Sequence, residues 1–231
     1  MTKQHFLTFG GGTPSLFPPN HLEPLFKRLR ELGLISTDTE ITLEANPGTL
    51  DLGHLEGYRD LGINRLSVGV QSFNAEVLKA LGRIHDRDQA VAMIERAKAI
   101  GLNRVNVDLM HGTPNQTPEI AREDLNIIRD LEVSHLSWYQ LTIEPNTAFY
   151  SKPPTLPEED TLEVTEEMGS EIINAMGLEH YEVSAFAKPG EEARHNLNYW
   201  EFGDYFGIGA GAHGKITTER GVIRTQRTRQ P

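Results

Sequence analysis

Polar residues that could bind a ligand follow several apolar segments of strand character. The first segment, Phe6–Phe9, runs directly into three glycines, Thr13 and Pro14. Glycine has no Cβ, so a ligand can lie directly against the backbone N–H groups of such a turn. Later segments end in carboxylates, carboxamides or a hydroxyl, namely Glu44 with Asn46, Gln71, Asp108, and Gln140 with Thr142. This set suits a ligand that has hydroxyls, a cationic group and a heterocycle edge.

The elements that must position these residues alternate along the chain. Apolar spacing predicts helices at 19–32, 52–61, 75–81, 87–100, 118–131 and 158–176. It predicts strands at 6–9, 40–46, 65–71, 105–110, 135–143 and 181–186. Repeated strand–helix units imply parallel strands with right-handed crossovers. We therefore expect an α/β fold in which six strands form a partial (β/α) TIM-type barrel, open rather than closed; a doubly wound open sheet is the second choice.

In such a barrel the C-terminal ends of the strands gather on one face, where active sites lie. A single polar residue at a strand end usually caps a helix or a turn. Five strand ends in succession that carry polar groups are harder to explain as caps. We therefore expect Gly12, Glu44, Gln71 and Asp108 to meet at one mouth of the barrel.

Composition excludes several classes of function. The 231 residues carry a net charge of -11, which argues against a nucleic-acid surface or an anchor to anionic membranes. There is no apolar run long enough to span a bilayer and no signal peptide at the start, so a cytoplasmic location is expected. The chain contains no cysteine, which excludes a disulfide, a thiolate-bound cluster or a cysteine nucleophile within these residues.

Six short strings occur in a fixed order: Gly10–Ser15, Glu44–Gly48, Gly69–Phe73, Leu81–His85, Asp108–Gly112 and Leu136–Thr147. Together they resemble the radical S-adenosylmethionine (SAM) family, in the group that contains the heme chaperone HemW and oxygen-independent coproporphyrinogen III dehydrogenase. The resemblance covers essentially the whole chain. It implies a partial barrel core at 1–190, with the site at the C-terminal ends of the parallel strands, and a family-specific extension at 191–231.

The resemblance also implies which residues bind SAM. The matching positions here are Gly11, Gly12, Thr13, Glu44, Gln71, Arg83 and Asp108. A carboxylate at Glu44 suits the sulfonium and amino groups of SAM. Asp108 suits ribose hydroxyls, and the fork of Arg83 suits a carboxylate.

One departure from the family pattern concerns the iron–sulfur cluster. The family binds a [4Fe–4S] cluster through three cysteines in a loop upstream of the glycine turn, and this chain has none. We therefore expect a fragment of a longer parent, without the N-terminal cluster loop and the C-terminal domain. Such a fragment cannot itself perform radical chemistry.

The segment His195–Trp200 indicates which branch of the family the chain resembles. It matches the His-Asn-x-x-Tyr-Trp motif of the HemW-like branch. A neutral histidine can ligate heme iron, and tyrosine and tryptophan offer flat apolar faces to a porphyrin. The simpler alternative is a hydrogen-bonded histidine beside core aromatics, and His85, His111, His135 and His180 are read in that way, whereas His213 stays a candidate site residue.

The resemblance implies a chaperone that binds SAM and heme and delivers heme to respiratory hemoproteins. The alternative is a coproporphyrinogen III dehydrogenase, which removes propionate carboxyl groups by radical oxidation, so enzymatic activity stays open. A phosphate-binding barrel enzyme is a weaker third candidate, because the lysine or late glycine-rich loop that it requires is missing.

Overall fold

The computed structural model describes residues 5–49 and 51–228. The chain divides into two compact units, residues 1–192 and residues 193–231. The first unit contains a seven-stranded sheet with the order β1-β2-β3-β4-β5-β7-β6. The strands are β1 (Phe6–Phe9), β2 (Glu40–Ala45), β3 (Arg65–Gln71), β4 (Arg104–His111), β5 (His135–Gln140), β6 (Glu179–His180) and β7 (Ala185–Ala187).

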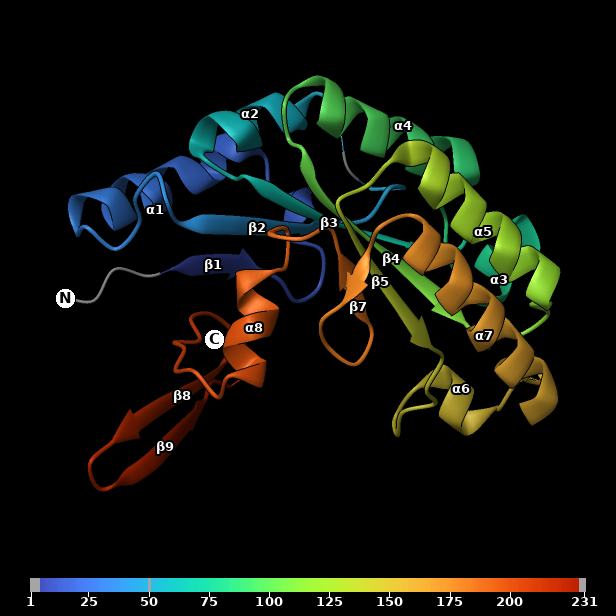
Figure 1. The fold of residues 1–231 in the computed structure, drawn as a ribbon. Helices are drawn as coiled ribbons and strands as arrows, with labels where there is room; N and C mark the ends of the chain where they lie inside the picture. Colours follow the sequence, from blue (N-terminus) through green and yellow to red (C-terminus); the bar gives the residue numbers. More distant parts are fainter. Residues whose placement is uncertain (1–4, 50, 229–231) are drawn as a thin grey trace. The chain divides into compact units, whose positions relative to one another are not determined.

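Strands β1 to β5 are parallel and adjacent in chain order. The helices of this unit are α1 (Pro19–Glu31), α2 (His54–Leu61), α3 (Ala75–Ala80), α4 (Arg87–Ala99), α5 (Pro118–Leu131), α6 (Ala148–Ser151) and α7 (Glu159–Ala175), with a short 3-10 turn at Pro14–Leu16. Figure 1 shows α1, α2, α4, α5 and α7 in an arc along one side of the sheet. This confirms the partial-barrel fold. The doubly wound alternative is wrong, because that fold covers both faces of the sheet and reverses the strand order.

Local signals explain why the helices begin and end where they do. Asp86 and Gln89 form a reciprocal capping box at the start of α4. Helix α5 follows the N-cap Thr117, whose side chain accepts from the backbone N–H of Ile120. Helix α2 ends at Gly62, which has a left-handed φ of +103°.

The last predicted strand was wrong in extent and direction. Instead of one parallel strand at 181–186, the structure has β6 and β7, and β7 pairs antiparallel with both β5 and β6. Only a short segment separates β6 from β7, and a short connection can join antiparallel strands but not parallel ones. Strand β5 also ends at Gln140 rather than at 143. Its neighbour β4 stops at His111, where Gly112 turns the chain away with a φ of +66°.

The two faces of the sheet differ in chemistry. On the side of the helices, Leu43, Leu66, Val107 and Leu136 are fully buried in the core. The residues on the opposite, inner face are polar along rows set by the strand register. One row joins Glu44 to Ser67, Asn106 and His135, and the next includes Asp108 and Ser137. The concave side of the partial barrel is therefore a polar wall.

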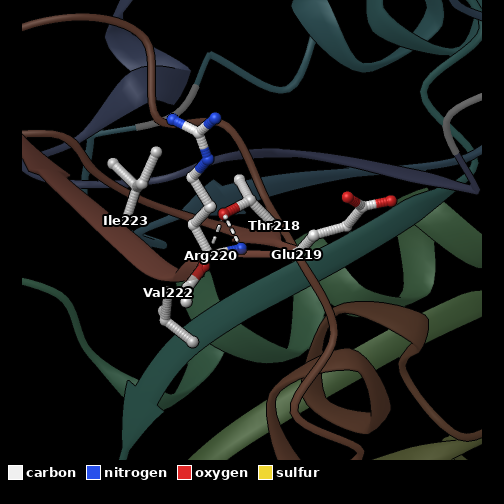
Figure 2. A pocket seen from close by; sticks show the side chains of 6 residues that line it. Thr218, Glu219, Arg220, Val222 and Ile223 are labelled. Carbon is white, nitrogen blue, oxygen red and sulfur yellow. Dashed lines mark hydrogen bonds between the residues drawn. The ribbon is translucent and has the colours of Figure 1, made fainter.

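The second unit contains α8 (Arg194–Trp200) and an antiparallel hairpin of β8 (His213–Thr218) and β9 (Gly221–Gln226). At the hairpin turn, Thr218 Oγ1 donates to the carbonyl of Gly221 at 2.8 Å and accepts from the N–H of Arg220 at 3.2 Å. Figure 2 shows this turn, beside which residues 218–223 line an open hollow. Lys215 on β8 binds the carboxylate of Asp204 at 3.0 Å and so ties the preceding loop to the hairpin.

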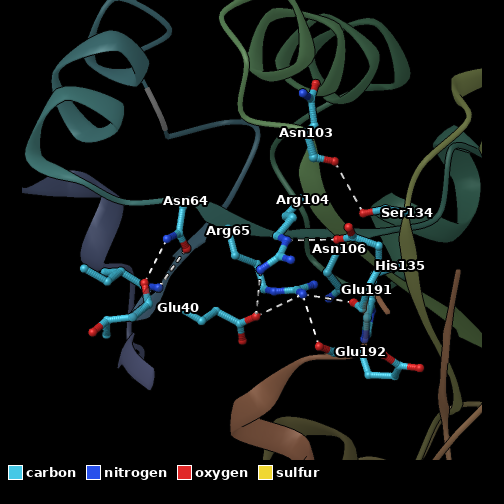
Figure 3. Close-up of polar contacts among 12 residues, drawn as sticks. Glu40, Asn64, Arg65, Asn103, Arg104, Asn106, Ser134, His135, Glu191 and Glu192 are labelled. Atoms are coloured by element: carbon cyan, nitrogen blue, oxygen red, sulfur yellow. Dashed lines mark hydrogen bonds and ion pairs between the residues drawn. The ribbon is translucent and has the colours of Figure 1, made fainter. Parts of the chain in front are cut away.

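An ion-pair cluster lies at the N-terminal ends of β2, β3 and β4 in the first unit (Figure 3). Arg65 is buried, and its Nη2 lies 3.1 Å from Glu40 Oε2. The same nitrogen donates to the backbone carbonyls of Glu191 and Glu192 at 2.9 and 3.2 Å. Arg104 adds an ion pair with Glu191 at 3.0 Å. Residues 191–192 are thereby fastened to the sheet.

Replacing Arg65 with methionine should lower the free energy of unfolding by about 3 kcal/mol or more, because Glu40 would keep a buried charge after losing a buried partner. Urea denaturation followed by circular dichroism measures this change. The matched control is Arg28→Met, since Arg28 pairs with Glu31 but its side chain is 65% exposed. That change should alter stability by less than about 1 kcal/mol. Equal denaturation midpoints for both variants would contradict the assignment.

Candidate functional site

The glycine turn after β1 lies against Glu44. The N–H of Gly11 donates to Glu44 Oε2 at 3.2 Å. A Cβ added at Gly10 would stand 2.5 Å from Glu44 Oε1, so only glycine leaves room for this carboxylate. Gly11 and Gly12 have left-handed φ values of +84° and +72°, and no atom of the described residues lies within 4 Å of where their Cβ atoms would be. The turn therefore leaves open space beside its glycines.

The turn is joined to the end of β3 through Asn46. Its Nδ2 donates to Thr13 Oγ1 at 3.3 Å. A Cβ added at Gly69 would lie 2.9 Å from Asn46 Oδ1 and 3.2 Å from Gln71 Nε2. Thr13, Asn46 and Gln71 therefore form a continuous polar surface across the ends of the first three strands.

Gln71 has an unusual backbone conformation. Its φ is +69°, and the register between β3 and β4 shifts between Gly69 and Gln71. A side chain in the left-handed region costs about 1–2 kcal/mol, so surrounding contacts must hold it there. The hydroxyl of Tyr139 on β5 donates to Gln71 Oε1 at 2.8 Å and fixes the direction of the carboxamide.

Asp108 lies on the inner face of β4 and accepts several hydrogen bonds. Asn106 Nδ2 donates to its Oδ1 at 2.8 Å, and Ser67 Oγ lies 3.3 Å from its Oδ2. Burial raises the pKa of Asp108, while the bonds from Asn106, Ser137 and Ser67 and the charge of Arg83 work in the opposite direction. The carboxylate is thus held in one orientation by neutral donors.

The two carboxylates of the site influence each other. Burial is the largest cause of the raised pKa of Glu44; the bond from Gly11 opposes this rise, and the charge of Asp108 adds to it. Burial, with the charge of Asp108 as a second cause, raises the pKa of Tyr139 to about 12. A pair of carboxylates in partly desolvated surroundings favours a cationic ligand or one that donates from hydroxyls.

Arg83 lies on the exposed loop between α3 and α4. Its positive charge lowers the pKa values of both Asp108 and Tyr139, so it acts on the same mouth. Contacts link Gly11 to Glu44 and Thr13 through Asn46 to Gln71, and Gly12 lies in the same glycine turn, while Asp108 and Arg83 are linked to this group through their charges. Their role as SAM ligands stays a prediction.

His195 lies on α8 in the second unit. Its ring makes an edge contact with Tyr199 at a centroid distance of 4.9 Å. Tyr199 in turn lies 4.8 Å from the ring of Tyr205. Burial and the Tyr205 hydroxyl raise the pKa of Tyr199 to about 12, so its hydroxyl stays protonated at neutral pH.

Several residues of the site escaped the sequence analysis. Tyr139, Asn106, Ser67 and Ser137 line the inner face, one or more residues before the strand ends on which attention was placed. The signal was present as alternation of polar and apolar residues over Arg104–Leu109 in β4 and His135–Trp138 in β5. It was missed because only the last residues of each strand were compared.

Residues 2–128 match the family model of the Radical SAM superfamily. The chain belongs to the radical SAM superfamily. Membership implies SAM and a [4Fe–4S] cluster as the cofactors of the family. The partial barrel and the glycine turn described above are the features of this radical SAM chain that position its candidate site.

Curated relatives of this radical SAM chain include heme chaperones. It is 50% identical over 223 residues to the heme chaperone HemW of Escherichia coli K12, which covers 96% of this chain and 59% of the relative. It is 48% identical to HemW of Haemophilus influenzae, over 99% of this chain and 60% of the relative. HemW of Bacillus subtilis is 38% identical, over 92% of this chain and 58% of the relative. The chain thus spans about three-fifths of the length of these relatives.

Solved structures agree with the fold. The radical SAM enzyme coproporphyrinogen III oxidase (HemN) from Escherichia coli superimposes with a TM-score of 0.83 at 26% identity, over 98% of this chain and 55% of that one. The archaeal Elp3 of Methanocaldococcus infernus matches with a TM-score of 0.60 at 19% identity, over 71% of this chain and 44% of that one, and shows the fold alone.

The residues present fit one of the two family cofactors. The open glycine turn and the carboxylates of Glu44 and Asp108 fit the backbone-binding, cationic and hydroxyl groups of SAM. The cluster does not fit these residues, since the sequence has no cysteine and the described residues contain no group of three or more His, Cys, Asp or Glu side chains suited to a metal.

No helix among the described residues is long and apolar enough to cross a membrane.

Replacing Arg83 with alanine should raise the pKa of Asp108 further, because the charge that favours the carboxylate is removed. The ¹³Cγ resonance of Asp108, followed by NMR against pH, reports the midpoint. Arg87→Ala is the control, since Arg87 influences Asp124 instead. An unchanged Asp108 midpoint in the Arg83 variant would separate Arg83 from the site.

Proposed function

We propose that the first unit binds SAM at the C-terminal ends of β1 to β4. The observation that carries this proposal is the convergence of the glycine turn, Glu44, Gln71 and Asp108 on one mouth of the sheet. Glu44 faces the positive groups of SAM, Asp108 accepts from its ribose hydroxyls, and Arg83 binds its carboxylate. In the family, one electron from the iron–sulfur cluster would break the sulfonium C–S bond of bound SAM, which would supply methionine and a 5′-deoxyadenosyl radical.

The second unit, as a family-specific extension, is proposed to bind heme through His195. The imidazole ligates the iron, and the neighbouring aromatic rings cover the porphyrin. Tyr199 and Trp200 are 45% and 53% exposed, so both offer apolar area to a flat ligand. The high identity to HemW, whose name states heme chaperoning, supports this assignment.

For the whole protein we propose a HemW-like heme chaperone that passes heme to respiratory hemoproteins. The [4Fe–4S] cluster of that protein would be held by cysteines outside these 231 residues. The similarity to HemN supports one alternative, a coproporphyrinogen III dehydrogenase. Full-length protein with a reconstituted cluster distinguishes the two: heme binding without porphyrinogen turnover is expected, and turnover without heme affinity would favour the alternative.

Glu44→Gln should weaken SAM binding by about tenfold, since one charge–charge contact is lost while the shape of the side chain is kept. Isothermal titration calorimetry on the 231-residue chain measures the dissociation constant. Glu31→Gln, a change of the same kind on the exposed face of α1, is the matched control and should leave binding unchanged. Equal affinities in all three proteins would contradict the role of Glu44.

His195→Ala should shift the Soret band of the heme complex and raise the dissociation constant by about tenfold or more, because the axial ligand is removed. Absorbance titration with hemin measures both quantities. His21→Ala serves as the control, as His21 lies on the exposed side of α1 in the first unit. A Soret band that is unchanged in the His195 variant would assign the iron ligand to another residue.

A further inference from the structure

In the turn after β3, side chains that are distant in sequence form hydrogen bonds on both sides of Gln71. Gln71 is in the left-handed region, with a φ of +69°. On the side before Gln71, His85 Nε2 donates to the carbonyl of Val70 at 2.9 Å; the direction follows because a carbonyl can only accept. The backbone on this side is thereby fixed.

On the side after Gln71, the buried Asp124 of α5 holds the turn with both carboxylate oxygens. Its Oδ1 accepts from the N–H of Phe73 at 2.8 Å, and its Oδ2 accepts from Ser72 Oγ at 2.6 Å. Ser72 Oγ also accepts from the N–H of Asn74 at 3.0 Å. Asp124 is only 3% exposed, so these neutral groups replace water around it.

The charge of Asp124 is unfavourable for folding. Burial raises its pKa from 3.8 to about 6, against the lowering effect of the bonds from Ser72 and Phe73; Glu123 on the same helix adds to the rise, while Arg87 on α4 opposes it. Asp124 and Asp130, both on α5, line one surface cleft together with Glu123 and Arg87. Because the folded pKa lies above the ordinary value, the chain loses stability as the pH rises from 3.8 to about 6. Both carboxylate oxygens are nevertheless engaged by the turn, and this geometry points to a role in positioning.

We propose that Asp124 is a positioning residue that fixes the 70–74 turn, so that the Gln71 carboxamide faces the ligand mouth. The fixed turn keeps Gln71 Oε1 on the hydroxyl of Tyr139 and leaves Gln71 Nε2 beside Gly69 for the ligand. This inference rests on the proposed SAM site and adds a residue from outside the mouth. The hydrogen bond from His85 to the carbonyl of Val70 fixes the backbone on the other side of Gln71.

The test is a double-mutant cycle on the 231-residue chain with SAM as the probe. Asp124→Asn keeps the shape and one acceptor for Phe73, but its amide nitrogen cannot accept the hydrogen bond that Ser72 Oγ donates to Asp124 Oδ2. We expect SAM to bind about fivefold to tenfold more weakly. In a Gln71→Ala background the same change should have no further effect, because Asp124 acts through Gln71.

NMR supplies a readout that does not depend on the ligand. Gln71 Nε2 lies close to Gly69, so a nuclear Overhauser effect between the side-chain amide and the Gly69 α-protons is expected in the parent chain. Asp124→Asn should remove it. Asp130→Asn is the matched control, since Asp130 is on the same helix with its side chain 72% exposed, and it should leave both the signal and the affinity unchanged.

Two results would overturn the inference: persistence of the Gln71–Gly69 signal in Asp124→Asn, or an equal loss of affinity with and without Gln71. If the unsubstituted 231-residue chain binds no SAM, the proposed SAM site is wrong. The NMR signal alone then tests the positioning role of Asp124. If Asp124→Asn does not fold, Ser72→Ala replaces it in the test, because this variant removes the hydrogen bond from Ser72 to Asp124. The same outcomes apply.

Discussion

Polar side chains on the inner face of the sheet can be buried only because they hydrogen-bond to one another. Tyr181 donates to His135 Nε2 at 2.6 Å, and His135 Nδ1 donates to Asn106 Oδ1 at 2.6 Å. Asn106 Nδ2 then donates to Asp108 at 2.8 Å. The chain of bonds works only with a neutral imidazole, and burial, with the charge of Arg65 as a second cause, lowers the pKa of His135 to about 3. Without these bonds each group would carry an unpaid desolvation cost.

The orientation of Asp108 is therefore set by residues some distance from the mouth. Ser67 and Asn106 belong to neighbouring strands, and the strand register places them in one row. The apolar outer face, packed against the helices, supplies the hydrophobic stabilisation that allows the inner face to remain polar. The two faces of the same strands therefore have different roles: the apolar outer face stabilises the fold, and the polar inner face is the one proposed to bind a ligand.

Strain and electrostatics meet at the end of β3. Gln71 adopts a conformation that few side chains adopt, and the neighbouring strands β2 and β4 carry the carboxylates Glu44 and Asp108, whose pKa values are raised by burial. A strained backbone conformation persists only where surrounding contacts hold it in place. Such strain and shifted pKa values are both common at functional sites. Here the contacts that hold the backbone come from Asp124 on α5, from Tyr139 on β5 and from His85 in the loop before α4.

The order of strands and helices could be predicted from the sequence, because apolar periodicity and glycine or proline stops act within a few neighbouring residues. The prediction failed at 181–186, where the pairing of two very short strands depends on which sheet edge is free rather than on local pattern. Glu44 and Gln71 at the strand ends, and Asp108 three residues before the end of β4, were also found in this way, since parallel strands place their C-terminal ends together.

By itself, then, the sequence determined the parallel βα arrangement, the glycine turn and the polar residues at the strand ends. Only the tertiary structure decided which residues support them. The bond from Asp124 to the Gln71 turn spans 51 residues, and that from Tyr139 to Gln71 spans 68. Such contacts have no local sequence signal, because they arise from the register and packing of whole elements and not from the preferences of neighbouring residues.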